Sequence, residues 1–305
     1  MKDLFYQKTN DTVILLFGGG QDSWAILTMF INDELFRKTY APNNLLVVMS
    51  DTGWEHPKTY IFNSKARQLC LDNDIEFYVV ERWMGYHPNT WQTLTHNWEL
   101  NQTIGSVAFP QTCTDNIKIK PVKKFVADWL RQKYGYDGKR TSDVYKQYYY
   151  EHGTLTHLIG FADKEQSRAK GYNGAVKWEK ECLDYEYPLI DLEIDRAQAQ
   201  EVISNYGYEV PPPSNCTICF YMSRQEILWL YRNLPNDFWY WVKLERAKIN
   251  KHRLLGLAEP KNQGPFGKKT IIQKTKEAIK QYGHLTSEEL EDYKFSHGHC
   301  TKSKF

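Results

Sequence analysis

The sequence predicts an α/β fold: a doubly wound, mostly parallel sheet with a helical region after it. Two observations lead to this prediction. In the N-terminal half, short apolar segments of strand length alternate with longer segments of helical periodicity, which is the order of a parallel sheet with crossover helices. After residue 195, helical patterns follow one another instead. The chain is therefore expected to consist of an α/β domain over 1–195 and a helical region over 196–305.

Four segments are predicted to be strands because they are short, apolar and partly β-branched, as in strands covered on both faces. They are residues 12–17, 45–50, 76–80 and 154–161. Helices are expected between them at 24–36, from Pro57 to about Asn73, and at 121–134. Pro57 and Pro121 suit the first turn of a helix.

The polar, tyrosine-rich stretch 135–153 is predicted to be a surface loop or insertion in the first domain. In the second region, helical spacing recurs after residue 195. Helices are expected there at 196–206, 224–234, 236–251 and 270–282. Pro211, Pro212 and Pro213 end the first of these patterns, and a Cys-x-x-Cys pair follows at once.

Composition sets outer limits on function. The 305 residues carry a formal net charge of +2, with 41% hydrophobic and 25% charged residues, which is ordinary for a globular protein. No segment approaches the roughly 20 apolar residues of a membrane-spanning helix. The start, MKDLFYQKTND, has no apolar signal segment. We therefore expect a cytoplasmic protein without membrane attachment.

Aromatic residues and charge each leave two interpretations open. Aromatic residues make up 15% of the chain, which suits either a tyrosine-rich core or surfaces on which bases stack. Residues 241–280 hold eleven Lys or Arg against three Glu, a net charge of +8. This segment is either a solvated helical face or a surface that binds a polyanion, because clustered cations neutralise phosphates and release counterions.

The most informative segment is Gly18-Gly19-Gly20-Gln21-Asp22-Ser23, between a predicted strand and a predicted helix. Glycines let backbone N–H groups approach an anion, and a helix N-terminus presents its positive end to that anion. Ser23 adds a hydroxyl donor. Asp22 is suited to orient the loop or to bind a metal ion carried by phosphates. The spacing matches neither the Walker A loop nor G-x-G-x-x-G.

This segment resembles the SGGxDS pyrophosphate loop of the PP-loop ATP pyrophosphatases, with Gly18 in place of the family's serine. Further elements resemble the phosphoadenosine phosphosulfate (PAPS) reductase branch of that superfamily. Asp51-Thr52-Gly53 with Pro57 is similar to its DTG-xxx-P element, at the end of a predicted strand, where open α/β sheets bind ligands.

Three later elements extend the resemblance over about residues 12–245. Cys113-Thr114 and Ile117-Lys118-Ile119 are similar to the CT-xx-LKI element, with Gln111 in place of its upstream arginine. Gly160, Glu165, Ser167 and Arg168 are similar to the G-x-R-x-x-E-S-x-R element, with Ala162 in place of its first arginine. Tyr187-Pro188-Leu189 and the Cys-x-x-Cys region resemble the tail of the same group.

The resemblance implies a Rossmann-like PP-loop domain that binds ATP, or a related adenine nucleotide, with Mg²⁺. The catalytic candidates are Asp22, Ser23, Lys118 and Arg168. The nucleotide-binding candidates are Gly18, Gly19, Gly20, Gln21, Asp22, Ser23, Asp51, Thr52, Gly53, Gly160 and Glu165. Structural interpretations stand beside these roles: Asp51 as a helix cap, Lys118 as a solvated lysine, and Glu165 with Arg168 as an ordinary i,i+3 pair.

Cys216 and Cys219 have the spacing of two ligands to zinc or to a 4Fe-4S cluster. Cys113 and Cys300 are candidates for the other two ligands, and His297 or His299 would also serve zinc. Some relatives carry such a cluster or zinc near the active site. The alternative is a pair of reduced thiols in a small core. Two other cysteines are predicted to be ordinary: Cys70 on a helix face and Cys182 in a charged loop.

Three functions remain open. The first is an enzyme that cleaves the α,β-bond of ATP to adenylate an acceptor, for sulfur or nitrogen transfer to a nucleic acid such as tRNA or DNA, with a sulfur donor. The second is a PAPS or APS reductase with a thioredoxin-like partner, in which Cys300 is the nucleophile, activated by a neighbouring imidazole. The third is a non-catalytic nucleotide-binding regulatory module. A homo-oligomer is expected in each case.

Overall fold

The computed structural model describes residues 11–108, 112–169, 176–257 and 264–296. Its centre is a five-stranded sheet in the order β3-β2-β1-β4-β5, and every pairing is parallel. The strands are β1 (Thr12–Leu16), β2 (Asn44–Ser50), β3 (Glu76–Val80), β4 (Leu155–Ile159) and β5 (Leu183–Glu186). The predicted doubly wound α/β fold is confirmed. The sequence pattern missed β5, because LDYE is short and half polar.

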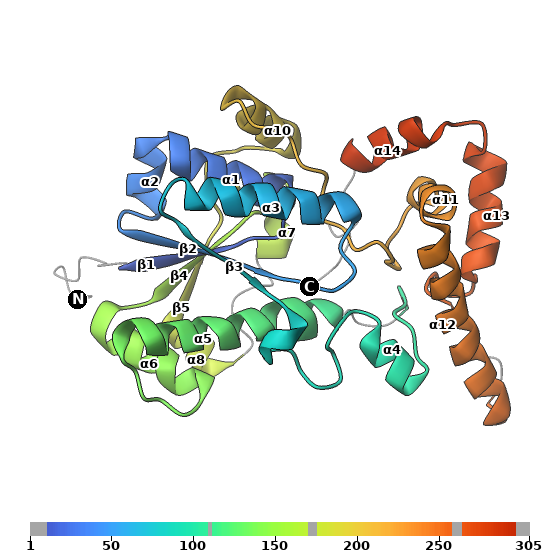
Figure 1. Cartoon of the computed structure of the whole chain (residues 1–305), viewed down its shortest axis with the longest axis horizontal. Coiled ribbons are helices and arrows are strands. Elements are labelled where there is room, and N and C mark those ends of the chain that lie inside the picture. Colours follow the sequence, from blue (N-terminus) through green and yellow to red (C-terminus); the bar gives the residue numbers. More distant parts are fainter. Residues whose placement is uncertain (1–10, 109–111, 170–175, 258–263, 297–305) are drawn as a thin grey trace.

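Helices cover both faces of the sheet (Figure 1). One face carries α1 (Gln21–Asn32), α2 (Glu34–Tyr40), α3 (Pro57–Leu71) and α10 (Arg196–Asn205). The other carries α5 (Lys120–Tyr134), α6 (Thr141–His152) and α8 (Lys177–Cys182). Strand side chains alternate between these two layers. Val13 and Leu15 belong to the core beneath α1, whereas Ile14 belongs to the core beneath α5 and α6.

The loop predicted over 135–153 is wrong for most of its length, because residues 141–152 form α6. Val144, Tyr145 and Tyr148 lie on one helical face, and each is at most 1% exposed. The Tyr148 hydroxyl lies within hydrogen-bond distance of the backbone N–H of Thr12, at 3.3 Å. Tyrosine therefore supplies core area here while its polar end is satisfied.

Two smaller predictions also need correction. The single helix predicted at 24–36 is two helices, since Asp33 ends α1 and caps α2 by accepting a hydrogen bond from the backbone N–H of Phe36 at 3.0 Å. Cys182 does not lie in a charged loop: it is the last residue of α8 and is 1% exposed. Cys70 is buried on α3, on the helix face that packs in the core, as predicted.

Shorter elements connect this framework. They are the 3₁₀ turn Arg82–Met84, α4 (His96–Asn101), the π-helical turn Thr114–Ile119, α7 (Gln166–Ala169) and α9 (Pro188–Asp191). The C-terminal helices are α11 (Arg224–Asn233), α12 (Pro235–Leu254), α13 (Ile271–Tyr282) and α14 (Ser287–Ser296). Figure 1 shows these four helices beside the sheet domain.

The C-terminal helices share a core with part of the first domain. Phe238 and Trp241 of α12 are fully buried in this core, together with Trp98 and Ile117 from the segment before α5. In contrast, Ala199 and Ile203 of α10 belong to the core under α1. The segment that joins α10 to α11 therefore crosses from one core to the other. Within the described ranges, no helix is long and apolar enough to span a bilayer.

Candidate active site

The glycine loop joins β1 to α1 and allows little substitution. Gly19 has φ +72°, a conformation that favours glycine. A Cβ on Gly20 would lie 2.6 Å from the backbone nitrogen of Ser214. The N-cap residue of α1 is Gly20, and no side chain of the described residues caps this helix end. The first turn of α1 therefore faces the same space as the loop, with the positive end of the helix dipole directed there.

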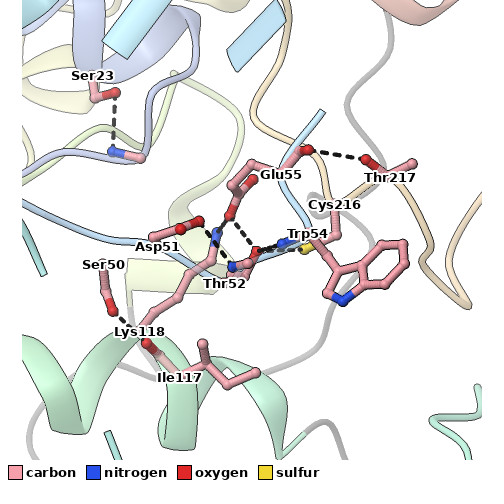
Figure 2. A network of polar contacts seen from close by, with 12 residues as sticks. Ser23, Ser50, Asp51, Thr52, Trp54, Glu55, Ile117, Lys118, Cys216 and Thr217 are labelled. Carbon is pink, nitrogen blue, oxygen red and sulfur yellow. Dashed lines mark hydrogen bonds and ion pairs between the residues drawn. The ribbon is translucent and has the colours of Figure 1, made fainter. Parts of the chain in front are cut away.

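Ser23 closes the loop onto itself. Its hydroxyl donates a hydrogen bond to the carbonyl of Gly20 at 3.0 Å. The backbone N–H of Gly18 donates to the same hydroxyl oxygen at 3.3 Å, and Figure 2 shows this second contact. The predicted hydroxyl donor is therefore engaged within the loop in this structure. Its present role is to hold the loop's shape.

The loop lies at the switch point of the sheet. β1 pairs with β2 on one side and with β4 on the other, so the chain order reverses between β1 and β4. Gly160 follows β4 directly, and a Cβ there would lie 2.8 Å from the backbone nitrogen of Ser23. A glycine is needed for β4 to approach α1 this closely. Open α/β sheets bind ligands at this type of position.

A cavity of about 260 Å³ opens at the carboxyl ends of β1, β2 and β4. The glycine loop forms one wall, and the segment 213–220 forms another. Four cationic side chains line it, each from a different element: Lys118, Lys123, Arg168 and Arg196. The cavity therefore combines a backbone anion site with positively charged side chains, which suits a phosphate chain.

Four charged groups meet at one edge of this cavity. Nη2 of Arg196 lies 3.7 Å from Oδ2 of Asp22 and 3.4 Å from Oε1 of Glu165. The other oxygen of Glu165 pairs with Nη1 of Arg168 at 2.8 Å. The ordinary i,i+3 pair and a place at the cavity are therefore both observed for Arg168. Glu165 itself lies behind the two arginines.

Asp22 is the perturbed group of this cluster. Burial raises its pKa from the usual 3.8 to about 6, although the positive charges of Arg196 and Arg168 act in the opposite direction. Its Oδ1 is buried and makes no hydrogen bond within the described residues. A strongly perturbed carboxyl in a cleft is a feature of functional sites.

The Asp51-Thr52-Gly53 segment divides two cavities. Its side chains alternate, so Thr52 lines the first cavity, whereas Asp51 and Gly53 line a second one of about 550 Å³ on the far side. Oδ1 of Asp51 accepts hydrogen bonds from the backbone N–H of Gly53 and the hydroxyl of Tyr60, both at 2.9 Å. Asp51 therefore shapes this turn, and only Thr52 of the three faces the loop's cavity.

Glu55 was not singled out by the sequence pattern, yet it contacts two residues that line the cavity, Thr52 and Lys118 (Figure 2). Its carboxylate accepts from the hydroxyl of Thr52 at 3.0 Å and pairs with Nζ of Lys118 at 3.3 Å. Lys118 comes from the π-helical turn, which Ser50 fixes by donating to the carbonyl of Ile117 at 2.5 Å. π-helical turns are frequent at functional sites.

Other residues of the site were also missed. Arg196 is the first residue of α10, Ser214 lies against the glycine loop, and His157 lies within β4. Burial lowers the pKa of His157 to about 3, so this cavity-lining imidazole is neutral. The one sequence signal for His157 was its position as a polar residue inside a mostly apolar strand.

Three predicted metal ligands share the cavity. Cys113, Cys216 and Cys219 all line it, and the thiol of Cys216 lies 3.9 Å from the hydroxyl oxygen of Thr52. Within the described ranges, however, no three His, Cys, Asp or Glu side chains are placed to hold a metal ion. Gln111, His297, His299 and Cys300 lie outside those ranges. The described residues alone do not form a zinc or iron–sulfur centre.

Comparison with known proteins agrees with the loop geometry. Residues 12–151 match the family described as phosphoadenosine phosphosulfate reductase domain. This range runs from β1 to α6 and includes the glycine loop, Asp51–Gly53 and Lys118. Over this range the chain matches the PAPS reductase-like branch of the PP-loop superfamily, as the sequence predicted.

Two further comparisons add little. The search of curated proteins found no match. Among solved structures, the chain is similar to "U34-tRNA thiolase NcsA from Methanococcus maripaludis with its 4Fe-4S cluster", at 15% identity over 92% of this chain and 83% of that one, with a TM-score of 0.34. A similarity of this size carries no argument about the activity of this chain.

Proposed function

We propose that the chain is an enzyme that binds ATP with its phosphate tail on the Gly18–Ser23 loop and transfers AMP to an acceptor. One observation carries this proposal: the glycine loop, at the switch point of the sheet, opens into a cavity lined by Lys118, Arg168 and Arg196. The match to a PAPS reductase domain supports an adenine nucleotide as the ligand.

The proposed reaction is an in-line displacement. An oxygen of the acceptor attacks the α-phosphorus, and the bond from that phosphorus to the bridging oxygen breaks. Pyrophosphate leaves with the electron pair, and the acceptor becomes adenylated. The loop N–H groups and the cationic side chains of Lys118 and Arg196 stabilise the charge that grows on pyrophosphate. A sulfur or nitrogen nucleophile then attacks the activated carbon, and AMP leaves with its electron pair.

Mg²⁺ normally accompanies such phosphates and neutralises part of their charge. Proteins hold it through one or two carboxylates and the phosphates themselves. Asp22 fits this requirement, because its Oδ1 is buried beside the loop and has no hydrogen-bond partner within the described residues. We propose Asp22 as the residue of this chain that would hold the ion.

We further propose that the acceptor is a nucleic acid, either tRNA or DNA. Support comes from the basic segment 241–280, some of whose charged residues are buried and others exposed. Glu245 and Lys248 are buried in the C-terminal core, whereas Lys243 of α12 and Lys276 and Lys280 of α13 are exposed. Exposed lysines on neighbouring helices form a surface that can contact phosphates.

The test is pyrophosphate release from ATP with Mg²⁺, measured over a panel of tRNA, DNA and small acceptors. Acceptor-dependent release that is lost in Gly20→Ala supports the proposal. Nucleotide binding without release from any acceptor would instead favour a regulatory module. A sulfur donor is required only for the second step, so release is expected without one.

A second candidate is favoured by the family description, which names a reductase domain. In that case the chain would reduce a sulfonucleotide and release sulfite. Incubation with PAPS or APS and a thioredoxin-like reductant would yield sulfite, and Cys300→Ser would abolish that turnover while nucleotide binding stays intact. ATP-dependent pyrophosphate release would be absent.

A further inference from the structure

Arg196 reaches the proposed nucleotide cavity from α10, whereas the glycine loop joins β1 to α1. It is the first residue of α10, which packs along α1 on the same face of the sheet (Figure 1). The side chain of Asp195 caps this helix by accepting from the backbone N–H groups of Ala197 and Gln198. Gln200 also donates to the side chain of Gln21 at 3.1 Å. α10 therefore presents Arg196 from a fixed position beside the loop.

The two arginines of the cavity are held differently. The guanidinium of Arg168 lies over the ring of Phe161 at 4.1 Å and pairs with Glu165 at 2.8 Å. The guanidinium of Arg196 is 3.4 Å from Glu165 and 3.7 Å from Asp22. Both contacts of Arg196 use Nη2 alone. Arg168 is thus tightly fixed, whereas Arg196 is held by long contacts through one of its nitrogens.

The guanidinium of Arg196 has hydrogen-bond donors that an anion in the cavity can use. A guanidinium offers five N–H donors in a planar fork. Nε and Nη1 of Arg196 donate no hydrogen bond to any residue that the structure describes. Because Arg196 lines the cavity with those donors unused, a phosphate beside the loop would find a bidentate partner there.

We propose that Arg196 binds the phosphate tail of the nucleotide directly, and that Arg168 acts as a positioning residue that fixes Glu165 and, through it, Arg196. This inference rests on the proposed nucleotide site. It assigns the ligand of Arg196 as a pyrophosphate group, and it predicts that the contact is specific to the phosphate tail. The nucleoside and the α-phosphate retained in AMP would make little use of it.

The test compares Arg196→Met and Arg196→Lys with the full-length wild-type chain. Isothermal calorimetry with Mg²⁺ measures the affinities for ATP, pyrophosphate and AMP. Arg196→Met is expected to weaken the affinities for ATP and for pyrophosphate roughly tenfold or more, which is the effect of losing one charge-assisted hydrogen-bonding group. The AMP affinity should change less than about twofold. Arg196→Lys keeps the charge but not the fork, and should lie between the two.

A matched control is Lys164→Met, which removes a cation 77% exposed that pairs with Asp195 at the start of the same helix. It should leave all three affinities unchanged. Equal pyrophosphate affinity in wild type and Arg196→Met would overturn the inference, and so would equal losses for AMP and ATP. If Arg196→Met fails to fold, judged by its melting temperature, Arg196→Lys decides by the same criterion.

The outcome for wild type separates this inference from the proposed function. If the wild-type chain binds neither ATP nor pyrophosphate, the proposed function fails, and the role of Arg196 fails with it. If wild type binds both and the Arg196 variants bind equally well, only the role of Arg196 fails. In that case Arg168→Met is expected to show the loss instead.

Discussion

Nζ of Lys118 lies 3.3 Å from Oε1 of Glu55, a carboxylate whose side chain is 0% exposed. Glu55 also pairs through its backbone with Cys216, and its carbonyl accepts from the hydroxyl of Thr217 at 3.0 Å. One residue thus joins the cavity lysine to the segment that carries the Cys-x-x-Cys pair. Oε2 of Glu55 has no hydrogen-bond partner within the described residues, so the charge of this carboxylate depends heavily on Lys118.

Removal of Lys118 is therefore expected to destabilise the fold. Lys118→Met leaves the buried carboxylate uncompensated and should lower the free energy of unfolding by on the order of 2 kcal/mol, less than a fully buried pair because Lys118 is partly exposed. Urea denaturation at pH 8 measures this loss. The double variant with Glu55→Gln should recover most of it, because neither charge remains. Additive losses from the two substitutions would contradict the dependence.

Substitutions at two glycines of the loop, Gly18 and Gly20, are expected to affect ATP binding differently. A Cβ at Gly20 would collide with the backbone of Ser214, whereas a Cβ at Gly18 would meet the Ser214 side chain at an ordinary 3.8 Å. Gly20→Ala should abolish ATP binding by displacing the loop, and Gly18→Ala should leave the affinity within about twofold. Gly18→Ser restores the hydroxyl of the SGGxDS pattern and should bind ATP at least as tightly. Calorimetry with ATP checks all three, and normal binding by Gly20→Ala would argue against a rigid loop.

The sequence predicted the parts of the site that local patterns encode. The glycine loop, Gly160 and Lys118 lie at the cavity because each follows or precedes a strand or helix whose apolar pattern is clear. Glu55 and Arg196 could not be predicted in this way. Their roles depend on contacts with residues 63 and 174 positions away, namely Lys118 and Asp22, which only the fold brings close.

One error and one unexpected side-chain placement have a related cause. Tyrosine counted as a polar residue in the stretch 135–153, but Tyr145 and Tyr148 bury their rings and satisfy their hydroxyls against backbone groups. Asp51 was predicted to bind the nucleotide; in the structure Thr52 lines the cavity beside the glycine loop, whereas Asp51 lines the second cavity. Periodicity identifies a face only after the neighbouring elements are placed.

The exposed lysines of α13 test the proposed nucleic-acid acceptor. Lys276 and Lys280 are four residues apart and share a helical face. If each contacts a phosphate, Lys276→Ala with Lys280→Ala should reduce the slope of log affinity against log salt by roughly 1.4 to 1.8. Fluorescence anisotropy with labelled tRNA and duplex DNA between 50 and 200 mM salt measures the slope. Removal of Lys38 and Lys139, exposed lysines of the sheet domain, is the charge-matched control, and an equal effect there would show a merely general attraction.

Asp22 predicts a pH dependence of stability with a defined sign. Its pKa is about 6 in the folded chain because burial penalises the charged form, against about 3.8 when unfolded. Between these values the folded state binds more protons, so the free energy of unfolding falls as pH rises from about 4 to 6 and stays low above that.

Asp22→Asn cannot ionise. It should match wild type near pH 4 and exceed its stability at pH 8 by up to about 3 kcal/mol, at roughly 1.4 kcal/mol per pKa unit. Urea denaturation at each pH, without nucleotide or Mg²⁺, measures the difference, and a pH-independent gap would contradict the assignment. The same variant should lose pyrophosphate release at pH 8, because an amide replaces the carboxylate that we propose holds Mg²⁺. A buried carboxylate that lowers stability is the kind of residue that proteins keep for activity.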